Sequence, residues 1–296
     1  MTISTKAMRM MVGSLGMVFL LAPLTVLAQN KVVVIPLFGN DAKPLKNIVT
    51  VAKSNGMFTD PVAAVNSISD ASASNPYLVV IGPGVYTITA TLQMKEYVDI
   101  AGSGENVTKV TGAISAYTQA SSAIISGAGH CALTSLTVEN TGGCQFSIGL
   151  YNKSASPVIR HVSATASGGD YNYGVWNFSS SPTMTNITAS ASGGDFNYGV
   201  YNHHSSSPIM TNITASASGG ADGNYGVGNF NSSPVIRRST LDAANYGLYS
   251  YTSITTVSQS TIKNGVRTEM DGKNTCVACD NGSGVALTGD CTEPTP

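Results

Sequence analysis

The sequence of 296 residues predicts an all-β protein, a right-handed parallel β-helix in which short strands stack coil upon coil. The first observation is a repeat: the segment that begins at Tyr173 returns almost letter for letter from Tyr198, more loosely from Tyr225, and in an earlier form from Ile148. The second is a period of two within each repeat, which is typical of strands. The third is the spacing of 25, 25, 27 and 21 residues between the matching glycines, Gly149, Gly174, Gly199, Gly226 and Gly247.

The first strand of each repeat carries an aliphatic residue directly after the matching glycine, as at Val175. A tyrosine or isoleucine stands two positions earlier, and an asparagine stands two positions later in most copies. Because residues two apart share a face of a strand, we expect all three columns to point inward, with the asparagines in a corner ladder. These columns are Ile148, Tyr173, Tyr198, Tyr225 and Tyr246; Leu150, Val175, Val200, Val227 and Leu248; and Asn152, Asn177, Asn202 and Asn229.

A Ser-Pro bend follows each first strand, at Pro157, Pro182, Pro208 and Pro234. A second strand then alternates small and polar residues, which places Val162, Ala164 and Ala166 on one inward face and predicts a narrow interior. Glycine pairs such as Gly193-Gly194 close the coil. Leucine-rich repeats would need a longer leucine pattern and often a helix per repeat, and both are absent from this sequence.

The chain divides into four parts by composition. Residues 1–28 resemble a secretory signal peptide, with Lys6 and Arg9 before an apolar run and a small-residue cleavage site; an uncleaved membrane anchor is the alternative. Residues 29–47 hold a strand-like run and a linker, 48–267 the β-helix, and 268–296 a polar, cysteine-containing tail. Asp60-Pro61 predicts the start of a short helix that covers the open end of the stack.

The charge of the chain excludes one class of partner. It has 15 Lys and Arg against 16 Asp and Glu, a net charge of −1, and no basic cluster, so we expect neither nucleic acid nor, after signal cleavage, a membrane span. The five cysteines fit an oxidising compartment. We expect Cys276 or Cys279 to pair with Cys291, whereas zinc bound by the Cys-x-x-Cys motif is less favoured because no histidine lies near it. Cys131 and Cys144 are the remaining disulfide candidates.

The region after Ile48 resembles the opening of pectin methylesterases. The resemblance covers roughly residues 48–112 and rests on three runs: Val49 to Ala52 with Gly56 to Thr59 and Ala63 to Val65; Val79 to Thr87; and Ile100 to Gly104. It implies the pectin-lyase-like β-helix superfamily, which agrees with the repeat. The whole chain is also similar to bacterial secreted β-helix proteins with tandem Asn-Tyr-Gly-Val-Tyr-Asn coils and no established activity.

The catalytic motifs that this resemblance implies are not found in the sequence. Pectin methylesterases carry a Gln-Asp pair, an Asp in an Asp-Phe-Ile-Phe-Gly run and an Arg in a Gly-Arg-Pro-Trp run. Gly194-Asp195-Phe196 looks similar to the second, but it recurs as Gly169-Asp170-Tyr171. A residue copied into successive coils is better explained by architecture than by catalysis.

Aromatic residues at the outward positions are the best binding candidates. Tyr151, Trp176, Tyr201 and Tyr249 alternate with the inward aliphatics, and Gly228 interrupts their row. An exposed aromatic band of this kind suits the faces of sugar rings and marks an interaction site. The alternative is that the rings stack only for stability, at roughly 0.2–1 kcal/mol per pair.

Acidic residues at successive turns are the weaker candidates. Asp170, Asp195 and Asp222 would repel one another unless a cation such as calcium lay between them, although aspartate in a Gly-Gly-Asp turn needs no ligand. Asp170 and Asp195, with Arg160 near by in sequence, could also form an acid–base pair, but nothing marks one as the acid. His130, His161, His203 and His204 show no nucleophile partner and no metal spacing. We expect no cofactor.

The sequence therefore predicts a secreted or cell-surface β-helix protein that is a non-catalytic scaffold or binds carbohydrate. Two alternatives stay open: a pectin-methylesterase-like or other polysaccharide-active enzyme with a degenerate site, and an adhesin-like structural element. A polysaccharide is the expected partner.

Overall fold

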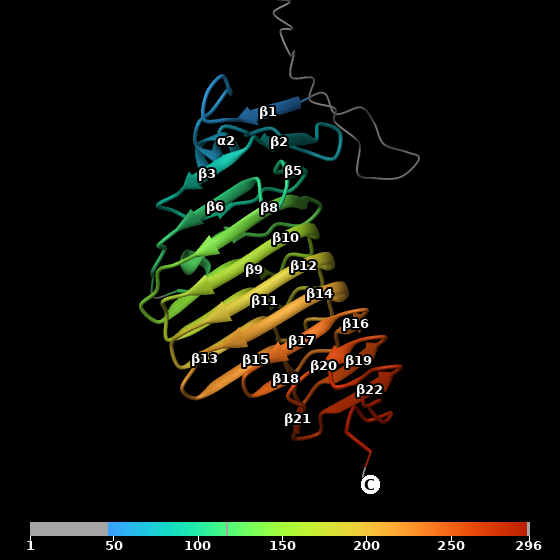
Figure 1. Cartoon of the computed structure of the whole chain (residues 1–296). Coiled ribbons are helices and arrows are strands. Elements are labelled where there is room, and N and C mark those ends of the chain that lie inside the picture. The colour runs from blue at the N-terminus through green and yellow to red at the C-terminus, as the bar shows by residue number, and fades with distance from the viewer. Residues whose placement is uncertain (1–46, 117, 295–296) are drawn as a thin grey trace, which may run out of the picture. The chain divides into compact units, whose positions relative to one another are not determined.

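The structure, a computed structural model, describes residues 47–116 and 118–294. The signal peptide predicted over 1–28 and the strand-like run that follows it lie outside this range. The described chain is a parallel β-solenoid with almost no helix, which confirms the fold class predicted from the repeat. Figure 1 shows the coils stacked one below the other, from β1 (Asn47–Val51) to β22 (Lys273–Val277).

Two parallel sheets run along the stack. The larger sheet has 14 strands. Besides β1 and β22 these are β2 (Tyr77–Ile81), β3 (Gly84–Thr87), β5 (Val98–Ala101), β6 (Thr108–Gly112), β8 (Ala132–Asn140), β10 (Val158–Ser167), β12 (Thr183–Ser192), β14 (Ile209–Ser218), β16 (Val235–Arg237), β17 (Thr240–Ala243), β19 (Ile254–Ser258) and β20 (Thr261–Ile262). The smaller sheet has 8 strands. They are β4 (Leu92–Gln93), β7 (Ala123–Ser126), β9 (Phe146–Lys153), β11 (Tyr171–Phe178), β13 (Phe196–His203), β15 (Gly223–Phe230), β18 (Tyr246–Tyr251) and β21 (Val266–Glu269).

The residues that pair between neighbouring strands are the same residues that align between the sequence repeats. Val175 pairs with Val200, and Trp176 pairs with Tyr201, so equivalent residues of successive repeats lie beside one another. In the larger sheet Ala164 pairs with Ala189 and Ala189 with Ala215. Like residues therefore stack on like residues about 4.8 Å apart, the usual distance between neighbouring strands.

Left-handed backbone marks the bends of each coil. One column of positive φ lies inside the long strands of the larger sheet and, farther along the stack, between the shorter strands that replace them; it comprises Ser135, His161, Asn186, Asn212, Arg238 and Gln259. A second column follows the strands of the smaller sheet; it comprises Ser154, Ser179, His204, Asn231 and Thr252. Glycines at positive φ, among them Gly168, Gly193 and Gly219, form the third bend before the chain re-enters the smaller sheet.

The interior is as narrow as the alanines predict. Val162, Ala164 and Ala166 are buried on the inner side of β10, and Val175 is fully buried opposite them. The two sheets approach so closely at Gly174 that an added Cβ would lie 2.7 Å from the amide nitrogen of Ser190 in β12. Only glycine leaves room for this backbone contact, which explains the column of glycines by which the repeats align.

Two asparagine ladders, buried except at the exposed Asn245, bind the coils together. The predicted ladder runs from Asn152 to Asn177, Asn202 and Asn229, each side-chain amide donating to the next at 2.8–2.9 Å, and ends on Thr255. A second ladder, which was not predicted from the sequence, runs at the glycine bend through Asn172, Asn197, Asn224 and Asn245 at 2.8–3.0 Å. Because each amide both donates and accepts, a column of asparagines satisfies polar groups that would otherwise be buried without partners.

The N-terminal end is covered by the predicted helix. Helix α2 (Pro61–Asn66) begins after Asp60, whose carboxylate accepts from the amides of Val62 and Ala63, both at 3.1 Å. Pro61 occupies the first turn, where a missing N–H is harmless. Val65 packs into the core, so the helix shields the first coils from water.

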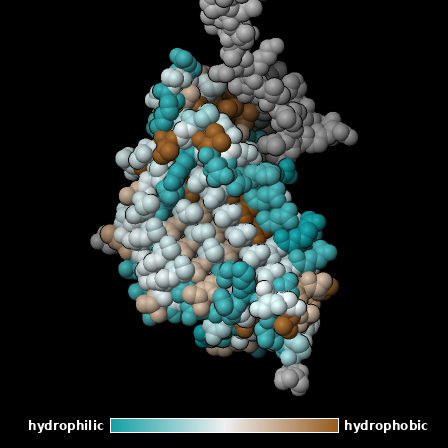
Figure 2. Space-filling view, in the orientation of Figure 1, coloured by the Kyte–Doolittle hydropathy of each residue, from teal (hydrophilic) through white to brown (hydrophobic). Residues whose placement is uncertain are grey.

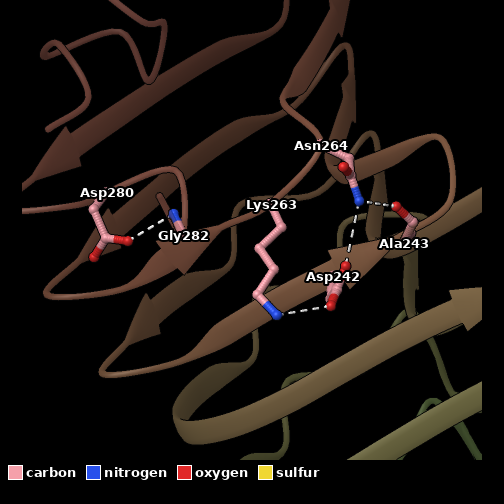
Figure 3. A network of polar contacts seen from close by, with 6 residues as sticks. All are labelled: Asp242, Ala243, Lys263, Asn264, Asp280 and Gly282. Atoms are coloured by element: carbon pink, nitrogen blue, oxygen red, sulfur yellow. Dashed lines mark hydrogen bonds and ion pairs between the residues drawn. The ribbon is translucent and has the colours of Figure 1, made fainter. Parts of the chain in front are cut away.

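The C-terminal end is held by a disulfide and by polar contacts. Cys276 pairs with Cys291, one of the two pairings expected from the sequence. Strand β22 pairs with β19, so parallel pairing continues beyond residue 267. Figure 3 shows the neighbouring polar contacts, in which Lys263 forms an ion pair with Asp242 at 3.0 Å.

Candidate functional site

Aromatic rings cover the outer surface of the smaller sheet from β9 to β18. We call this surface the aromatic face. Its buried members form a cluster separate from the interior core, and partly buried rings pack against them. The buried rings are Tyr151, Tyr173, Trp176, Tyr198, Tyr225 and Tyr249; the partly buried ones are Phe146, Tyr171, Phe178, Phe196, Tyr201, Phe230, Tyr246 and Tyr251.

The tyrosine column that includes Tyr173 lies on this outer surface, so the prediction that it points inward with the aliphatic residues was wrong. Gly174 faces the opposite sheet, and Val175 after it is also buried in the interior core. Two consecutive inward positions shift the alternation by one residue. Tyr173 and Trp176 therefore emerge on the same side, with their ring centroids 4.4 Å apart.

The rings stack both within and between coils. Tyr173 and Tyr198 are stacked at 5.3 Å, and Trp176 meets Tyr201 edge-on at 5.4 Å. Both arrangements are favourable for aromatic rings and contribute about 0.5–1.5 kcal/mol per pair beyond area burial. The aromatic face is thus a rigid surface whose rings keep one another in place.

The predicted binding residues lie on the outer surface, but the expectation that they form an exposed band was wrong for three of the four. Tyr151, Trp176 and Tyr249 are 3%, 5% and 7% exposed, because their neighbours cover them, and Tyr201 is half-buried. At Gly228, where the row lacks a side chain, an added Cβ would lie 2.6 Å from the ring of Tyr198, so that ring fills the gap. The half-buried rings therefore form most of the surface that a ligand would meet. The period of two that marked Trp176 also reaches Phe178, but it assigns Tyr171 to the other face, so the sequence pattern did not indicate that ring.

Burial favours the uncharged form of several titratable groups of the aromatic face near pH 7. Burial raises the pKa of the Tyr173 and Tyr198 hydroxyls, so these phenols keep their protons. Burial and the neighbouring His204 lower the pKa of His203, which favours the uncharged imidazole. The indole Nε1 of Trp176 has no hydrogen-bond partner among the described residues.

The acidic row lies at the edge of the aromatic face. Asp170, Asp195 and Asp222 are exposed, and their backbones are joined by hydrogen bonds of 2.8 Å and 3.0 Å from each amide to the preceding aspartate. No group of three or more acidic, histidine or cysteine side chains in the described part of the chain is arranged to hold a metal ion. Calcium at this row stays a prediction.

Arg160 is not brought to the aspartates. It lies in β10 of the larger sheet, next to the left-handed bend at His161, and forms none of the ion pairs found among the described residues. The structure therefore supplies no contact that would support an acid–base role for Asp170, Asp195 and Arg160 together.

The histidines and remaining cysteines are dispersed. His130 stacks on Tyr97, His161 contacts Asn186, and His203 and His204 pack beside the ring of Phe178. The cysteines without a disulfide in the described part of the chain are Cys131, Cys144 and Cys279. Burial raises the pKa of Cys131 to about 12, so this thiol is protonated and inert near neutral pH.

Comparison with solved structures supports the architecture. The chain is similar to pectin methylesterase from carrot (TM-score 0.62, 16% identity, 86% of this chain and 90% of that one), and to that from Erwinia chrysanthemi (0.59, 16%, 86% and 94%). It is similar, too, to a pectin methylesterase in complex with a hexasaccharide (0.58, 15%, 86% and 94%). No protein-family model and no curated protein sequence matches the chain.

These likenesses establish a pectin-methylesterase-like right-handed β-helix fold, as the resemblance of residues 48–112 implied. At 15–16% identity they show the fold alone. Within the described ranges, no helix has the length and apolar character needed to span a bilayer.

Proposed function

We propose that this protein is a non-catalytic, secreted or surface-exposed β-helix that binds carbohydrate on its aromatic face. The observation that supports it is the continuous outer layer of rings on β9 to β18, separate from the interior core. Aromatic faces stack on the C–H faces of sugar rings, and half-buried rings such as Tyr171 and Phe178 are accessible from this surface. The disulfide fits an oxidising compartment.

The rigidity of the aromatic face favours recognition of an extended polymer. The rings are fixed by stacking and by the backbone ladder, so binding would not require them to become ordered, which lowers the cost of association. Successive coils repeat the same rings about 4.8 Å apart. A chain of sugars lying across the coils would meet an equivalent surface at each step. One structural relative holds a hexasaccharide, which is compatible with this use of the fold.

The test uses half-buried rings, whose removal leaves the interior intact. Tyr171→Ser and Phe178→Ser should together weaken retention of the protein on insoluble or gel-embedded glycans at least tenfold, because each ring contributes about 1 kcal/mol of stacking or more. Ile254→Ser provides the control: Ile254 is 61% exposed on β19 of the larger sheet, so its loss should leave retention unchanged. Urea denaturation checks that all variants fold.

Equal retention of the ring variants and the wild-type protein across the glycan panel would show that the aromatic face does not bind carbohydrate. Release of methanol or sugar by the wild-type protein would show that it is an enzyme, and would contradict the non-catalytic proposal.

A further inference from the structure

The ring columns of the aromatic face end in charged residues at β21. Arg267 pairs with Tyr249 in the sheet register, and Glu269 pairs with Tyr251. Both side chains point outward, since Val266 beside them packs on the interior core. β21 is the last strand of the smaller sheet, below β18 in Figure 1. The repeat is therefore replaced, on the same surface, by an arginine and a glutamate.

These side chains form one fixed cluster with Tyr249. Glu269 Oε1 accepts from Arg267 Nε at 2.6 Å and also contacts Nη2, while Oε2 accepts from the Tyr249 hydroxyl at 2.8 Å. The guanidinium carbon lies 5.5 Å from the Tyr249 ring centroid and 5.7 Å from that of Tyr246. Stacking on two rings and pairing with a carboxylate hold the guanidinium in one orientation.

The cluster keeps unused hydrogen-bonding capacity toward water. The Arg267 and Glu269 side chains are 43% and 34% exposed. A guanidinium has five N–H donors, and the contacts above use only part of them. Among the described residues, no other side chain accepts from Arg267. The carboxylate oxygens also retain free lone pairs, so the cluster presents donors and acceptors side by side.

We propose that Arg267, Glu269 and Tyr249 form a polar end-subsite that binds neighbouring hydroxyls of an uncharged sugar, so that the aromatic face selects neutral glycans over polyuronates. This inference rests on the proposed carbohydrate-binding function. A vicinal diol both donates and accepts, which matches the adjacent guanidinium and carboxylate. Hydrogen bonds to charged groups are the stronger ones and fix orientation.

The charges of the surface oppose an acidic ligand. Arg267 is already neutralised by Glu269, whose carboxylate would repel a uronate, and the exposed row of Asp170, Asp195 and Asp222 borders the same surface. Lys153, near the ring of Phe178, is a cation on the opposite part of the aromatic face and lies far along the stack from β21. The balance of charge thus favours a neutral polymer.

The experiment is a calorimetric comparison of cellohexaose, mannohexaose, hexagalacturonate and permethylated cellohexaose, which keeps its ring faces but has no hydroxyl donors. Arg267→Gln and Arg267→Lys should each weaken binding of the better neutral hexaose about tenfold. Lysine keeps the positive charge, but neither residue has the planar set of N–H donors of the guanidinium. Binding of the permethylated sugar should be the same in these variants as in the wild type. Glu269→Gln, which leaves Arg267 unpaired, should weaken neutral binding and create salt-sensitive binding of hexagalacturonate.

Lys263→Gln and Asp242→Asn are the matched controls. This pair lies in the same C-terminal coils (Figure 3), and the two side chains are similarly exposed at 44% and 39%. Asp242 is in β17 of the larger sheet, and Lys263 directly follows β20 of the same sheet. Neither variant should change any affinity. If Arg267 and Glu269 variants bind neutral hexaoses like the wild type while Phe178→Ser loses binding, the end-subsite is refuted and the proposed function stands. If neither the wild type nor any variant binds a glycan, both proposals fail.

Discussion

The asparagine ladder allows a sharp prediction about the stability of the stack. Asn177 lies in the middle of the ladder and is completely buried; it accepts from Asn152 at 2.8 Å and donates to Asn202 at 2.9 Å. Replacing it with alanine removes both bonds and leaves one donor and one acceptor buried without partners. At about 1–3 kcal/mol for each such group, Asn177→Ala should lower the free energy of unfolding by about 2–6 kcal/mol.

The first rung of the same ladder supplies an internal comparison. Asn152 is also completely buried and donates to Asn177, but its own Oδ1 has no partner among the described residues. Asn152→Ala therefore orphans one group, the Asn177 carbonyl oxygen, and removes a group that is already unsatisfied. The expected loss is about 1–3 kcal/mol, smaller than that for Asn177→Ala.

Urea denaturation followed by circular dichroism measures the difference. Ser192→Ala, at an exposed position of β12, serves as the control and should stay within about 0.5 kcal/mol of the wild type. If Asn152→Ala is as destabilising as Asn177→Ala, the cost does not depend on the number of orphaned groups. The ladder would then stabilise the stack by packing rather than by hydrogen bonding, which would refute the predicted difference between the two variants.

Three further predictions concern other parts of the fold. Gly174→Ala places a Cβ 2.7 Å from the amide nitrogen of Ser190, so it should lower the free energy of unfolding by about 1–3 kcal/mol. Urea denaturation measures this loss, and an unchanged midpoint would show that the sheets can move apart. Cys276→Ser removes the disulfide, whose cysteines are separated by 15 residues, and should lower the free energy of unfolding by about 3 kcal/mol. Hydrogen exchange should increase in the last coils before the rest of the stack, whereas a uniform increase would contradict a local role. The lowered pKa of His203 means that the folded state binds fewer protons than the unfolded state, so stability is complete above about pH 6.5 and is lost as pH falls below it. His203→Phe should flatten the dependence of melting temperature on pH between 7 and 5, and an equally steep profile in this variant would assign the effect to other groups.

The fold could be predicted from sequence because its determinants are local and repeated. Five aligned copies show which positions are always aliphatic, and in a parallel stack these positions must lie on one another. The helix cap at Asp60 was equally predictable, since it depends on two adjacent residues. The asparagine ladder could be predicted from the same alignment, because asparagines stacked in a buried column can hydrogen-bond to one another.

The facing of Tyr173 could not be obtained from the alternation rule. That rule assumes an uninterrupted strand, whereas Gly174 and Val175 both face the interior. The reason is tertiary: at Gly174 the opposite sheet lies too close to the strand for any side chain. The distance between the two sheets cannot be predicted from a local sequence pattern. The same shift doubles the ring columns on the outer surface, so the aromatic face is broader than the single row of Tyr151, Trp176, Tyr201 and Tyr249 that the sequence indicated.

Polar and aromatic side chains of the repeats contact equivalent side chains in the next coil, which favours a binding function over a catalytic one. A residue copied into each coil finds its partner in the next copy: amides hydrogen-bond to amides, rings stack on rings, and serine hydroxyls such as Ser190 and Ser216 meet at 2.8 Å. Groups satisfied in this way have little tendency to react, but together they make a uniform surface for a repeating ligand. A side chain can take a distinct chemical role only at a position where the residue is not repeated from coil to coil. At the C-terminal end of the aromatic face β21 is such a position, because Arg267 and Glu269 replace rings there, so selectivity among sugars should depend on this end even though most of the contact area lies elsewhere.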